Sequence, residues 1–255
     1  MHLGGLGFLG TAIWCYCRRN GELVGAMNAR AVKLKKAYLF SDLDDVVLDR
    51  IADLCDWRRY QKGRQIVGEQ DMTNVVYILT AGKVRAKRFS TSGKEVSYRD
   101  LDEGATFGEY SAIDARPRSA TVVALTDCET AVLGQSEFLT LIQEHPAVAM
   151  RFIKELVQQV RSLSDRVFEF STLAVNNRIH AELVRMAGDA PEEAGGVRRI
   201  KSPPTHLEIA NRISTHREAV SRELAYLESE GLIKKSRQVL EILDIERLRA
   251  MITNI

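Results

Sequence analysis

The sequence predicts an α+β protein with three successive parts: an antiparallel β-domain, one long helix and a compact C-terminal unit built on two short helices. Short runs of β-branched and aromatic residues, separated by turn signals, fill residues 57–133. Apolar residues spaced three and four positions apart follow over residues 153–174. A capped pair of short helical patterns then lies within residues 205–224. Together these three observations indicate the fold class.

The composition is that of a globular protein of one or two domains. The chain has 255 residues and a formal net charge of +2, a length that suits one large or two ordinary domains. Hydrophobic residues make up 45% and charged residues 27%, so the chain is not expected to be disordered. A charge this close to zero does not by itself indicate a nucleic-acid partner. The four cysteines lack metal-binding spacing, which predicts reduced thiols in the cytoplasm and no metal site.

Residues 1–30 are predicted to form an extension outside the folded domains. The segment Leu3–Cys17 is apolar and glycine-rich, but it is shorter than the ~20 residues that a membrane-spanning helix needs. It also lacks the basic segment that precedes the apolar core of a signal peptide. We expect the extension to be disordered or to lie upstream of a true translation start at Met27, and a weak membrane anchor is the less favoured alternative. No other segment is predicted to cross a bilayer.

Residues 31–145 are predicted to form the β-domain. Helices are expected near its two ends, over Asp42–Cys55 and Ser136–His145. The short strands between them are predicted at Gln65–Val67, Val75–Leu79, Val84–Phe89, Val96–Leu101, Ala120–Leu125 and Thr130–Leu133. Turn signals such as Ser92-Gly93 separate these runs, and strands at such close spacing favour an antiparallel sandwich or barrel.

Residues 146–174 are predicted to form one long helix, with Pro146 in its first turn. Its apolar positions follow a heptad seam formed by Ile153, Leu156, Val160, Leu163, Val167 and Phe170. β-branched residues at a and leucine at d favour a parallel two-stranded coiled coil. The alternative is a single amphipathic helix packed on its own domain, which usually needs a wider apolar stripe. The seam therefore predicts a homodimer.

The most informative stretch of the β-domain combines Gly108-Glu109-Tyr110 with Arg118-Ser119. Gly108 at the start of a helical turn lets backbone N–H groups approach an anion. Arg118 carries a fork of donors suited to phosphate, and Glu109 can accept a hydrogen bond from a ribose hydroxyl. These residue types together predict a nucleotide site. The alternative is that Glu109 and Arg118 only pair with each other.

Residues 175–255 are predicted to form a separate C-terminal domain, joined to the long helix by a hinge near Leu173–Asn177. Thr205 caps the first short helix, and Glu208 at the third helical position completes a capping box. A turn near Ser214 follows, and Ser214 would carry about 1–2 kcal/mol of strain if it were left-handed. The second helix begins with the polar residues Thr215, His216, Arg217, Glu218, Ser221 and Arg222. The alternative to a binding role is a two-helix core element with a solvated charged face.

The order of these motifs resembles the cyclic-AMP receptor and fumarate–nitrate regulator (Crp/Fnr) superfamily over residues 39–243. The resemblance implies an N-terminal β jelly-roll that binds a cyclic nucleotide, a long dimerisation helix and a C-terminal winged helix-turn-helix. The basic turn over residues 234–237 is similar to the wing of that fold.

The resemblance also implies roles for the nucleotide-site residues. Glu109 would hold the ribose 2′-hydroxyl and Arg118 the cyclic phosphate, assisted by Gly108 and Ser119. In the family a Thr-Ser pair on the long helix contacts adenine, and here Leu163 and Ser164 occupy that place. The resemblance favours cyclic AMP as the effector. Because the threonine that contacts adenine is missing, cyclic GMP is the alternative effector.

For the C-terminal domain the resemblance implies DNA binding. Arg217, Glu218 and Arg222 would contact base edges, with Ser221 on the same outward face, because the start of a recognition helix enters the major groove. Thr205, Thr215 and His216 are candidate phosphate contacts.

The implied function is a homodimeric transcription regulator that binds palindromic double-stranded DNA and works with RNA polymerase. A nucleotide that binds one alignment of the paired helices better would shift the population towards DNA binding. Two alternatives remain open: the same fold sensing a redox or gas signal, and a nucleotide-hydrolysing enzyme. The enzyme is the less favoured, because no nucleophile–base pair or paired carboxylates are apparent.

Overall fold

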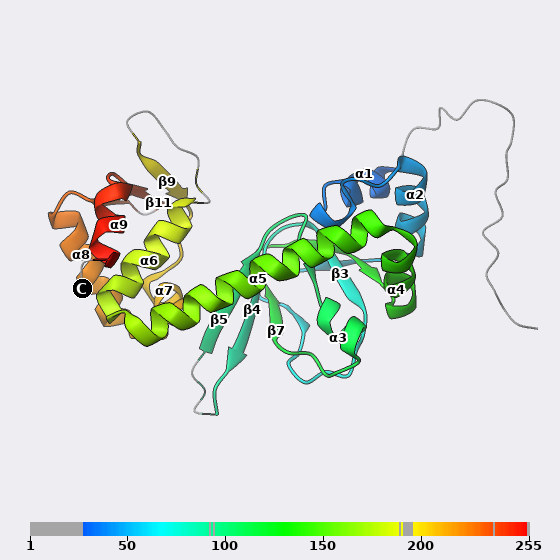
Figure 1. Cartoon of the computed structure of the whole chain (residues 1–255), viewed down its shortest axis with the longest axis horizontal. Helices are drawn as coiled ribbons and strands as arrows, with labels where there is room; N and C mark the ends of the chain where they lie inside the picture. The colour runs from blue at the N-terminus through cyan, green and yellow to red at the C-terminus, as the bar shows by residue number, and fades with distance from the viewer. Residues whose placement is uncertain are drawn as a thin grey trace, which may run out of the picture.

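The computed structural model describes residues 28–253, except residues 92, 94, 189, 191–195 and 237. The extension predicted over residues 1–30, with its possible start at Met27, lies almost wholly outside this range. In the described part, a β-rich N-terminal domain and a mostly helical C-terminal domain lie at opposite ends of one long helix (Figure 1). None of the helices described here is long and apolar enough to cross a bilayer.

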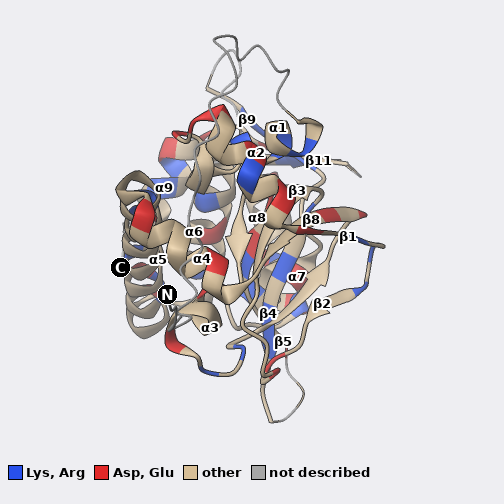
Figure 2. Ribbon diagram, turned by 90° about the vertical axis from the view of Figure 1, so that its right-hand side faces the viewer, with Lys and Arg blue, Asp and Glu red and all other residues tan. Residues whose placement is uncertain are grey.

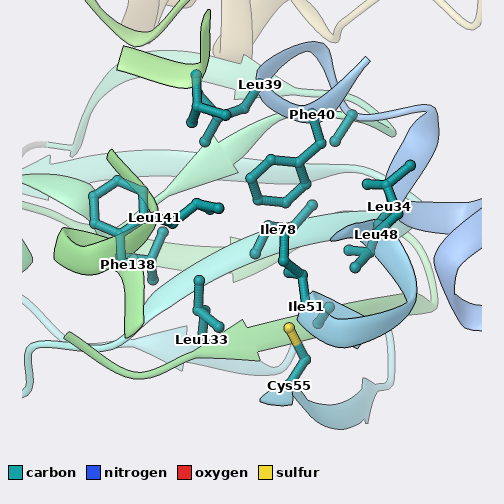
Figure 3. Close-up of a cluster of buried hydrophobic side chains, with 14 of the residues drawn as sticks. Leu34, Leu39, Phe40, Leu48, Ile51, Cys55, Ile78, Leu133, Phe138 and Leu141 are labelled. Atoms are coloured by element: carbon teal, nitrogen blue, oxygen red, sulfur yellow. The ribbon is translucent and has the colours of Figure 1, made fainter. Parts of the chain in front are cut away.

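Three short helices open the N-terminal domain: α1 (Ala29–Lys35), the 3₁₀-helix η1 (Tyr38–Phe40) and α2 (Asp45–Leu54). Asn28 caps α1, because its side chain accepts a hydrogen bond from the N–H of Arg30. Their apolar side chains, including Leu34, Phe40 and Leu48, pack with Ile78 and Leu133 of the sheet in one buried cluster (Figure 3). The sequence pattern predicted α2 but missed α1 and η1.

The β-domain is an antiparallel sandwich, which confirms the predicted class. Its strands are β1 (Asp56–Tyr60), β2 (Gln65–Val67), β3 (Val76–Ala81), β4 (Val84–Phe89), β5 (Glu95–Leu101), β6 (Thr106–Phe107), β7 (Thr121–Ala124) and β8 (Cys128–Leu133). They form two four-stranded sheets in the orders β1-β8-β3-β6 and β2-β7-β4-β5. Side chains such as Leu79, Val84 and Val122 fill the space between the sheets. The sequence missed β1, which is mostly polar, and the two-residue strand β6.

Helix α3 (Glu109–Asp114) follows β6, and α4 (Gln135–Glu144) leads into the long helix α5 (Pro146–Thr172). Val148 and Phe152 anchor the first half of α5 in the β-domain core. The rings of Phe138 and Phe152 meet edge to face, with centroids 6.0 Å apart. The rest of α5 continues to the C-terminal domain (Figure 1).

The predicted heptad seam on α5 needs a correction. Leu156 is half-buried against the core of its own β-domain, so it does not lie on the exposed apolar stripe. Leu163 is 54% exposed, as the seam predicts, and it also lines a cavity. Ile153, Val160 and Val167 are exposed as the seam predicts, and the exposed residues Val157 and Ser164 lie on the same side of α5. The exposed apolar side chains of the stripe are Met150, Ile153, Val157, Val160 and Val167. Phe170 is also exposed, and the Arg178 guanidinium lies over its ring.

The C-terminal domain consists of α6 (Val175–Gly188), β9 (Arg198–Lys201), α7 (His206–Arg212), α8 (Arg217–Ser229), β10 (Ile233–Lys235), β11 (Val239–Ile242) and α9 (Ile245–Thr253). Helices α7 and α8 form the predicted pair, and the antiparallel hairpin β10–β11 stands where the wing was expected. Strand β9 extends this hairpin into a three-stranded sheet. Ile179, Leu183, Ile209 and Leu224 form the centre of a core separate from that of the β-domain.

Candidate functional site: a cassette in the β-domain and an exposed helix in the C-terminal domain

The loop between β6 and α3 is shaped by Gly108. Its φ of +84° is left-handed, and a Cβ built there would lie 2.6 Å from Nη1 of Arg118 and 3.0 Å from the carbonyl oxygen of Val75. Any other residue would therefore be strained and would displace Arg118. Gly108 thus permits the close approach of Arg118 to the backbone.

Arg118 is held rigidly by the protein, with 2% of its surface exposed. Its Nε donates to Oγ1 of Thr73 at 2.9 Å, Nη1 to the carbonyl oxygen of Gly108 at 2.6 Å, and Nη2 to that of Val75 at 2.8 Å. A guanidinium has five N–H groups, so one remains on each terminal nitrogen. Burial lowers the pKa of Arg118, and no ion pair with Glu109 forms among the described residues. This buried cation suits an anionic ligand.

Glu109 lies beside it in an equally enclosed place, with 7% of its surface exposed. Burial, helped by the charge of Glu155, raises the pKa of its carboxyl to about 7, against the opposing effects of a hydrogen bond from its own backbone and the charges of Arg99 and Arg118. The carboxyl is therefore partly protonated at neutral pH. A ligand hydroxyl can be its partner in either state.

We call the segment from Gly108 to Ser119, which carries Glu109 and Arg118, the cassette. Helix α5 forms the wall opposite it. Tyr110 of α3 donates its hydroxyl proton to Oε1 of Gln159 on α5, which ties the cassette to the long helix. A cavity of about 1420 Å³ lies between them. This volume exceeds the roughly 300–1,000 Å³ of an ordinary ligand pocket, because the cavity continues along α5 to the C-terminal domain.

The cavity brings together most of the predicted nucleotide-site residues. Those that line it are Gly108, Glu109, Tyr110, Arg118, Ser119 and Leu163. Ser164 is the exception: it is exposed on the stripe with Val160, whose carbonyl oxygen accepts its hydroxyl proton at 3.0 Å. Sequence reasoning missed Gln159, although its spacing of four residues from Leu163 places both on one side of α5.

The capping box predicted at the start of α7 is confirmed. Oγ1 of Thr205 accepts a hydrogen bond from the N–H of Glu208 at 3.2 Å, and Oε2 of Glu208 accepts one from the N–H of Thr205 at 2.7 Å. These two bonds satisfy two backbone donors that the helix leaves unpaired.

The start of α8 presents an exposed charged surface. Arg217, Glu218 and Arg222 are exposed there, and the exposed residue His216 is the N-cap. Ser221 is half-buried, with its hydroxyl 2.7 Å from Nδ1 of His206 on α7.

Thr215 requires a correction as a phosphate contact. It is 8% exposed, and its N–H donates to the carbonyl oxygen of Ala210, so it fills the junction between the two helices. A side chain buried in this junction does not face a DNA backbone.

Ser214 is left-handed, with a φ of +53°. A non-glycine residue in this conformation costs about 1–2 kcal/mol. Replacing Ser214 with glycine should therefore stabilise the C-terminal domain by up to about 1 kcal/mol, after the greater freedom of glycine in the unfolded chain is subtracted. Urea unfolding at equilibrium measures this change. Ser229→Gly, at the last residue of α8, is the control and should not stabilise; equal stability of Ser214→Gly and the wild type would contradict the strain.

Comparison with known proteins agrees with this architecture. Residues 57–145 match the cyclic nucleotide-binding domain family, and residues 177–251 match the Crp-like helix-turn-helix domain. A cyclic AMP receptor protein from Thermus thermophilus is 29% identical over 209 residues, which cover 82% of this chain and 94% of that protein. A CRP-like cAMP-activated global transcriptional regulator from Mycobacterium tuberculosis is 22% identical, with 84% of this chain and 96% of that protein covered.

Solved structures share the fold. A mutant of CooA from Carboxydothermus hydrogenoformans matches with a TM-score of 0.70 at 20% identity, covering 79% of this chain and 89% of that one. FixK2 from Bradyrhizobium japonicum matches with a TM-score of 0.68 at 18% identity, covering 79% of this chain and 98% of that one. With the cyclic nucleotide-binding and Crp-like helix-turn-helix domains in this order, the chain belongs to the Crp/Fnr family of transcription regulators.

Proposed function

We propose that the protein is a homodimeric regulator whose grip on palindromic DNA is switched by a cyclic nucleotide, with cyclic AMP favoured and cyclic GMP possible. The observation that carries the proposal is that Arg118 and Glu109 share one cavity with α5. A ligand held there can act on the helix that leads to the DNA-binding domain. The protein would bind DNA in the cytoplasm, and RNA polymerase would be its partner if it activates transcription.

The two charged groups of the cassette suit the two polar parts of a cyclic nucleotide. Arg118 retains two N–H groups for a singly charged phosphate, and Glu109 offers an acceptor to the ribose 2′-hydroxyl. Gln159 lies on the α5 wall, and Ser164 lies on the exposed stripe of α5. In a dimer, Ser164 would reach the base from the partner chain.

The exposed stripe on α5 supports the dimer. Val160 and Val167 are 62% and 64% exposed in the single chain, and apolar side chains repeated in this way mark an interface. Pairing two such helices in parallel would bury both stripes as a coiled coil. The two copies of α8 would then be set about one DNA turn, ~34 Å, apart.

Replacing Val160 with glutamate should dissociate this dimer. The change would place two like charges in the middle of an apolar seam, each without a partner. We expect the sedimentation coefficient to fall from that of a dimer to that of a monomer at micromolar concentration. Lys154→Glu, exposed on α5 but off the stripe, is the control and should remain dimeric. A Val160→Glu variant that stays dimeric would show that the seam lies elsewhere.

The cysteines that the structure describes do not favour a redox-sensing function. Cys55 and Cys128, the cysteines within the described residues, are both buried, and burial raises the pKa of Cys55 to about 12. A thiol that stays protonated is a poor ligand for an iron–sulfur cluster.

The proposed function is tested in two steps with the full chain. Calorimetry with cyclic AMP and cyclic GMP should show binding of at least one of them. Double-stranded DNA of random sequence is then enriched on the protein with and without the better ligand, and a palindrome with half-sites about one turn apart is expected only with ligand. Equal enrichment in both arms, or no binding of either nucleotide, would overturn the proposal.

A further inference from the structure

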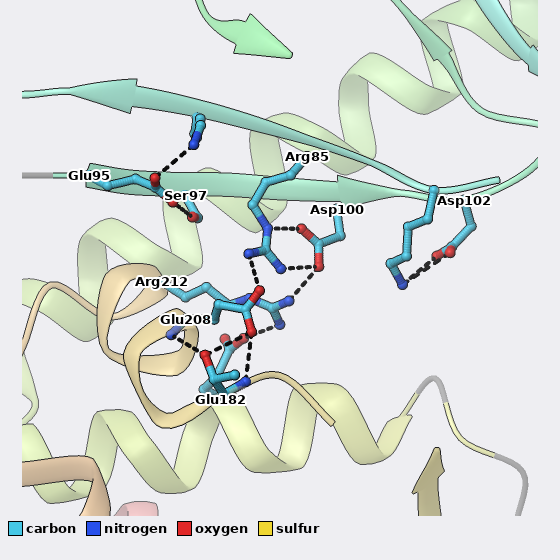
Figure 4. Close-up of polar contacts among 11 residues, drawn as sticks. Arg85, Glu95, Ser97, Asp100, Asp102, Glu182, Glu208 and Arg212 are labelled. Atoms are coloured by element: carbon cyan, nitrogen blue, oxygen red, sulfur yellow. Dashed lines mark hydrogen bonds and ion pairs between the residues drawn. The ribbon is translucent and has the colours of Figure 1, made fainter. Parts of the chain in front are cut away.

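A network of ion pairs joins the β-domain directly to helix α7 of the C-terminal domain (Figure 4). Arg85 in β4 pairs with Asp100 in β5, with Nη2 donating to Oδ2 at 2.9 Å, and Nη1 of Arg85 donates to Oε1 of Glu208 in α7. Arg212, one turn further along α7, donates from Nη2 to Oδ2 of Asp100 at 2.6 Å. Glu208 and Arg212 of α7 thus both bind the hairpin formed by β4 and β5.

A second layer connects this contact to the other helices. Nη1 of Arg212 donates to Oε1 of Glu182 in α6 at 3.0 Å, and Glu182 is 1% exposed. Arg166 on α5 donates to the carbonyl oxygen of Arg212 at 3.3 Å. Asp100, Arg166 and Arg212 also line the cavity that holds Arg118. The network therefore borders the proposed ligand site.

The contact is enclosed and charge-matched. The side chains of Arg85, Asp100 and Arg212 are 8%, 14% and 16% exposed. Burial opposes the ionisation of Asp100, yet hydrogen bonds from Arg85 and the charge of Arg212 hold the pKa of Asp100 below its ordinary value. Such a pair is costly to break from one side, because the remaining buried charge loses its partner. Elsewhere, basic and acidic residues are interspersed along the helices and strands (Figure 2).

We propose that Arg85, Asp100, Glu208 and Arg212 form a latch that holds the C-terminal domain on the β-domain of its own chain and keeps it from DNA. Its effect on DNA binding rests on the proposed function. The first helix of a helix-turn-helix crosses the DNA backbone, where a basic side chain such as Arg212 suits phosphate. In the latch Arg212 is neutralised by Asp100 and Glu182 instead. DNA and the β-domain therefore compete for α7.

Helix α5 is the element through which a ligand would release the latch. Gln159 and Arg166 lie two turns apart on α5, the first bonded to the cassette through Tyr110 and the second to the backbone of Arg212. A ligand that moves α5 relative to the cassette changes both contacts at once. In the closed state the latch is formed and the C-terminal domain is held on the β-domain. The strength of the latch sets how large a fraction of the ligand-free protein is in this state.

The test compares two conservative substitutions that are two residues apart. Asp100→Asn removes the charge shared by Arg85 and Arg212, whereas Asp102→Asn removes the charge of an exposed pair with Lys83 that does not touch α7. The rate of amide hydrogen exchange in peptides from α7 and β5 reports whether the latch is formed. The affinity of the nucleotide-free protein for the palindrome enriched above reports the effect of the latch on DNA binding. Glu208→Gln is a second latch variant, because glutamine can still complete the capping box.

We expect Asp100→Asn and Glu208→Gln to speed exchange in both peptides and to raise ligand-free DNA affinity about tenfold, equivalent to about 1.4 kcal/mol. Asp102→Asn should match the wild type in both measurements. Unchanged exchange in both latch variants would overturn the contact, and faster exchange with unchanged or weaker DNA binding would overturn its inhibitory role. Failure of the wild type to bind DNA with nucleotide would count against the proposed function alone, because exchange still reports the latch.

Discussion

Replacing Arg118 with leucine is expected to weaken nucleotide binding severely and to remove the nucleotide dependence of DNA binding at ligand concentrations that saturate the wild type. The guanidinium is the buried cation of the cassette, and losing one member of a buried, hydrogen-bonded charge pair costs about 2–5 kcal/mol of binding free energy. Affinity should therefore fall by roughly 30-fold or more. Calorimetry on the folded variant measures this loss.

The same substitution should also lower the stability of the ligand-free protein. Arg118 donates to Thr73 and to the carbonyl oxygens of Gly108 and Val75, and each buried acceptor left unpaired costs about 1–3 kcal/mol. The melting temperature without nucleotide should drop by several degrees. Arg118→Lys keeps the charge but cannot make all three bonds, so its nucleotide affinity should lie between those of Arg118→Leu and the wild type.

Arg116→Leu is the matched control, since it removes a positive charge from the same loop at an exposed position. It should leave nucleotide affinity and melting temperature close to those of the wild type. If Arg118→Leu bound cyclic AMP and cyclic GMP as the wild type does, the assignment of the phosphate site would be wrong.

The order of domains could be predicted from the sequence because periodicity and capping are local signals. The run Val84–Phe89 predicts a strand, and the Thr205 capping box predicts a helix start, without any knowledge of distant residues. Strand β1 was missed because its sequence, DWRRY, carries little apolar alternation. In the seam, Leu156 and Val157 are both apolar, and only the position of the β-domain decides which of them is covered.

The latch lay beyond sequence reasoning for a different reason. Arg85 and Glu208 are 123 positions apart, and each has a simpler interpretation, Arg85 as a polar strand residue and Glu208 as half of a capping box. In the structure Glu208 takes part in both the capping box and the latch, because its Oε2 accepts from Thr205 and its Oε1 accepts from Arg85. The cassette, by contrast, was visible because its residues are close in the chain.

Replacing Glu109 with glutamine should stabilise the ligand-free protein at high pH. Burial raises the pKa of Glu109 from 4.5 to about 7, so the folded state binds this proton more tightly than the unfolded state. Its contribution to stability is complete below pH 4.5 and is lost as the pH rises through 7. The loss is on the order of 3 kcal/mol, from about 1.4 kcal/mol per pKa unit. Glutamine cannot ionise, so the variant should not lose this stability.

Unfolding by urea at pH 5 and pH 8 should show the difference. The wild type should lose more stability than Glu109→Gln between these values, while Glu144→Gln, at an exposed position on α4, should follow the wild type. The ligand should respond in the opposite sense: an ionised Glu109 accepts the ribose hydroxyl more strongly, so wild-type nucleotide affinity should rise from pH 6 to pH 8. The affinity of Glu109→Gln should be lower and flat. Parallel pH profiles for the wild type and Glu109→Gln, in stability and in affinity alike, would show that this carboxyl neither titrates near neutrality nor holds the sugar.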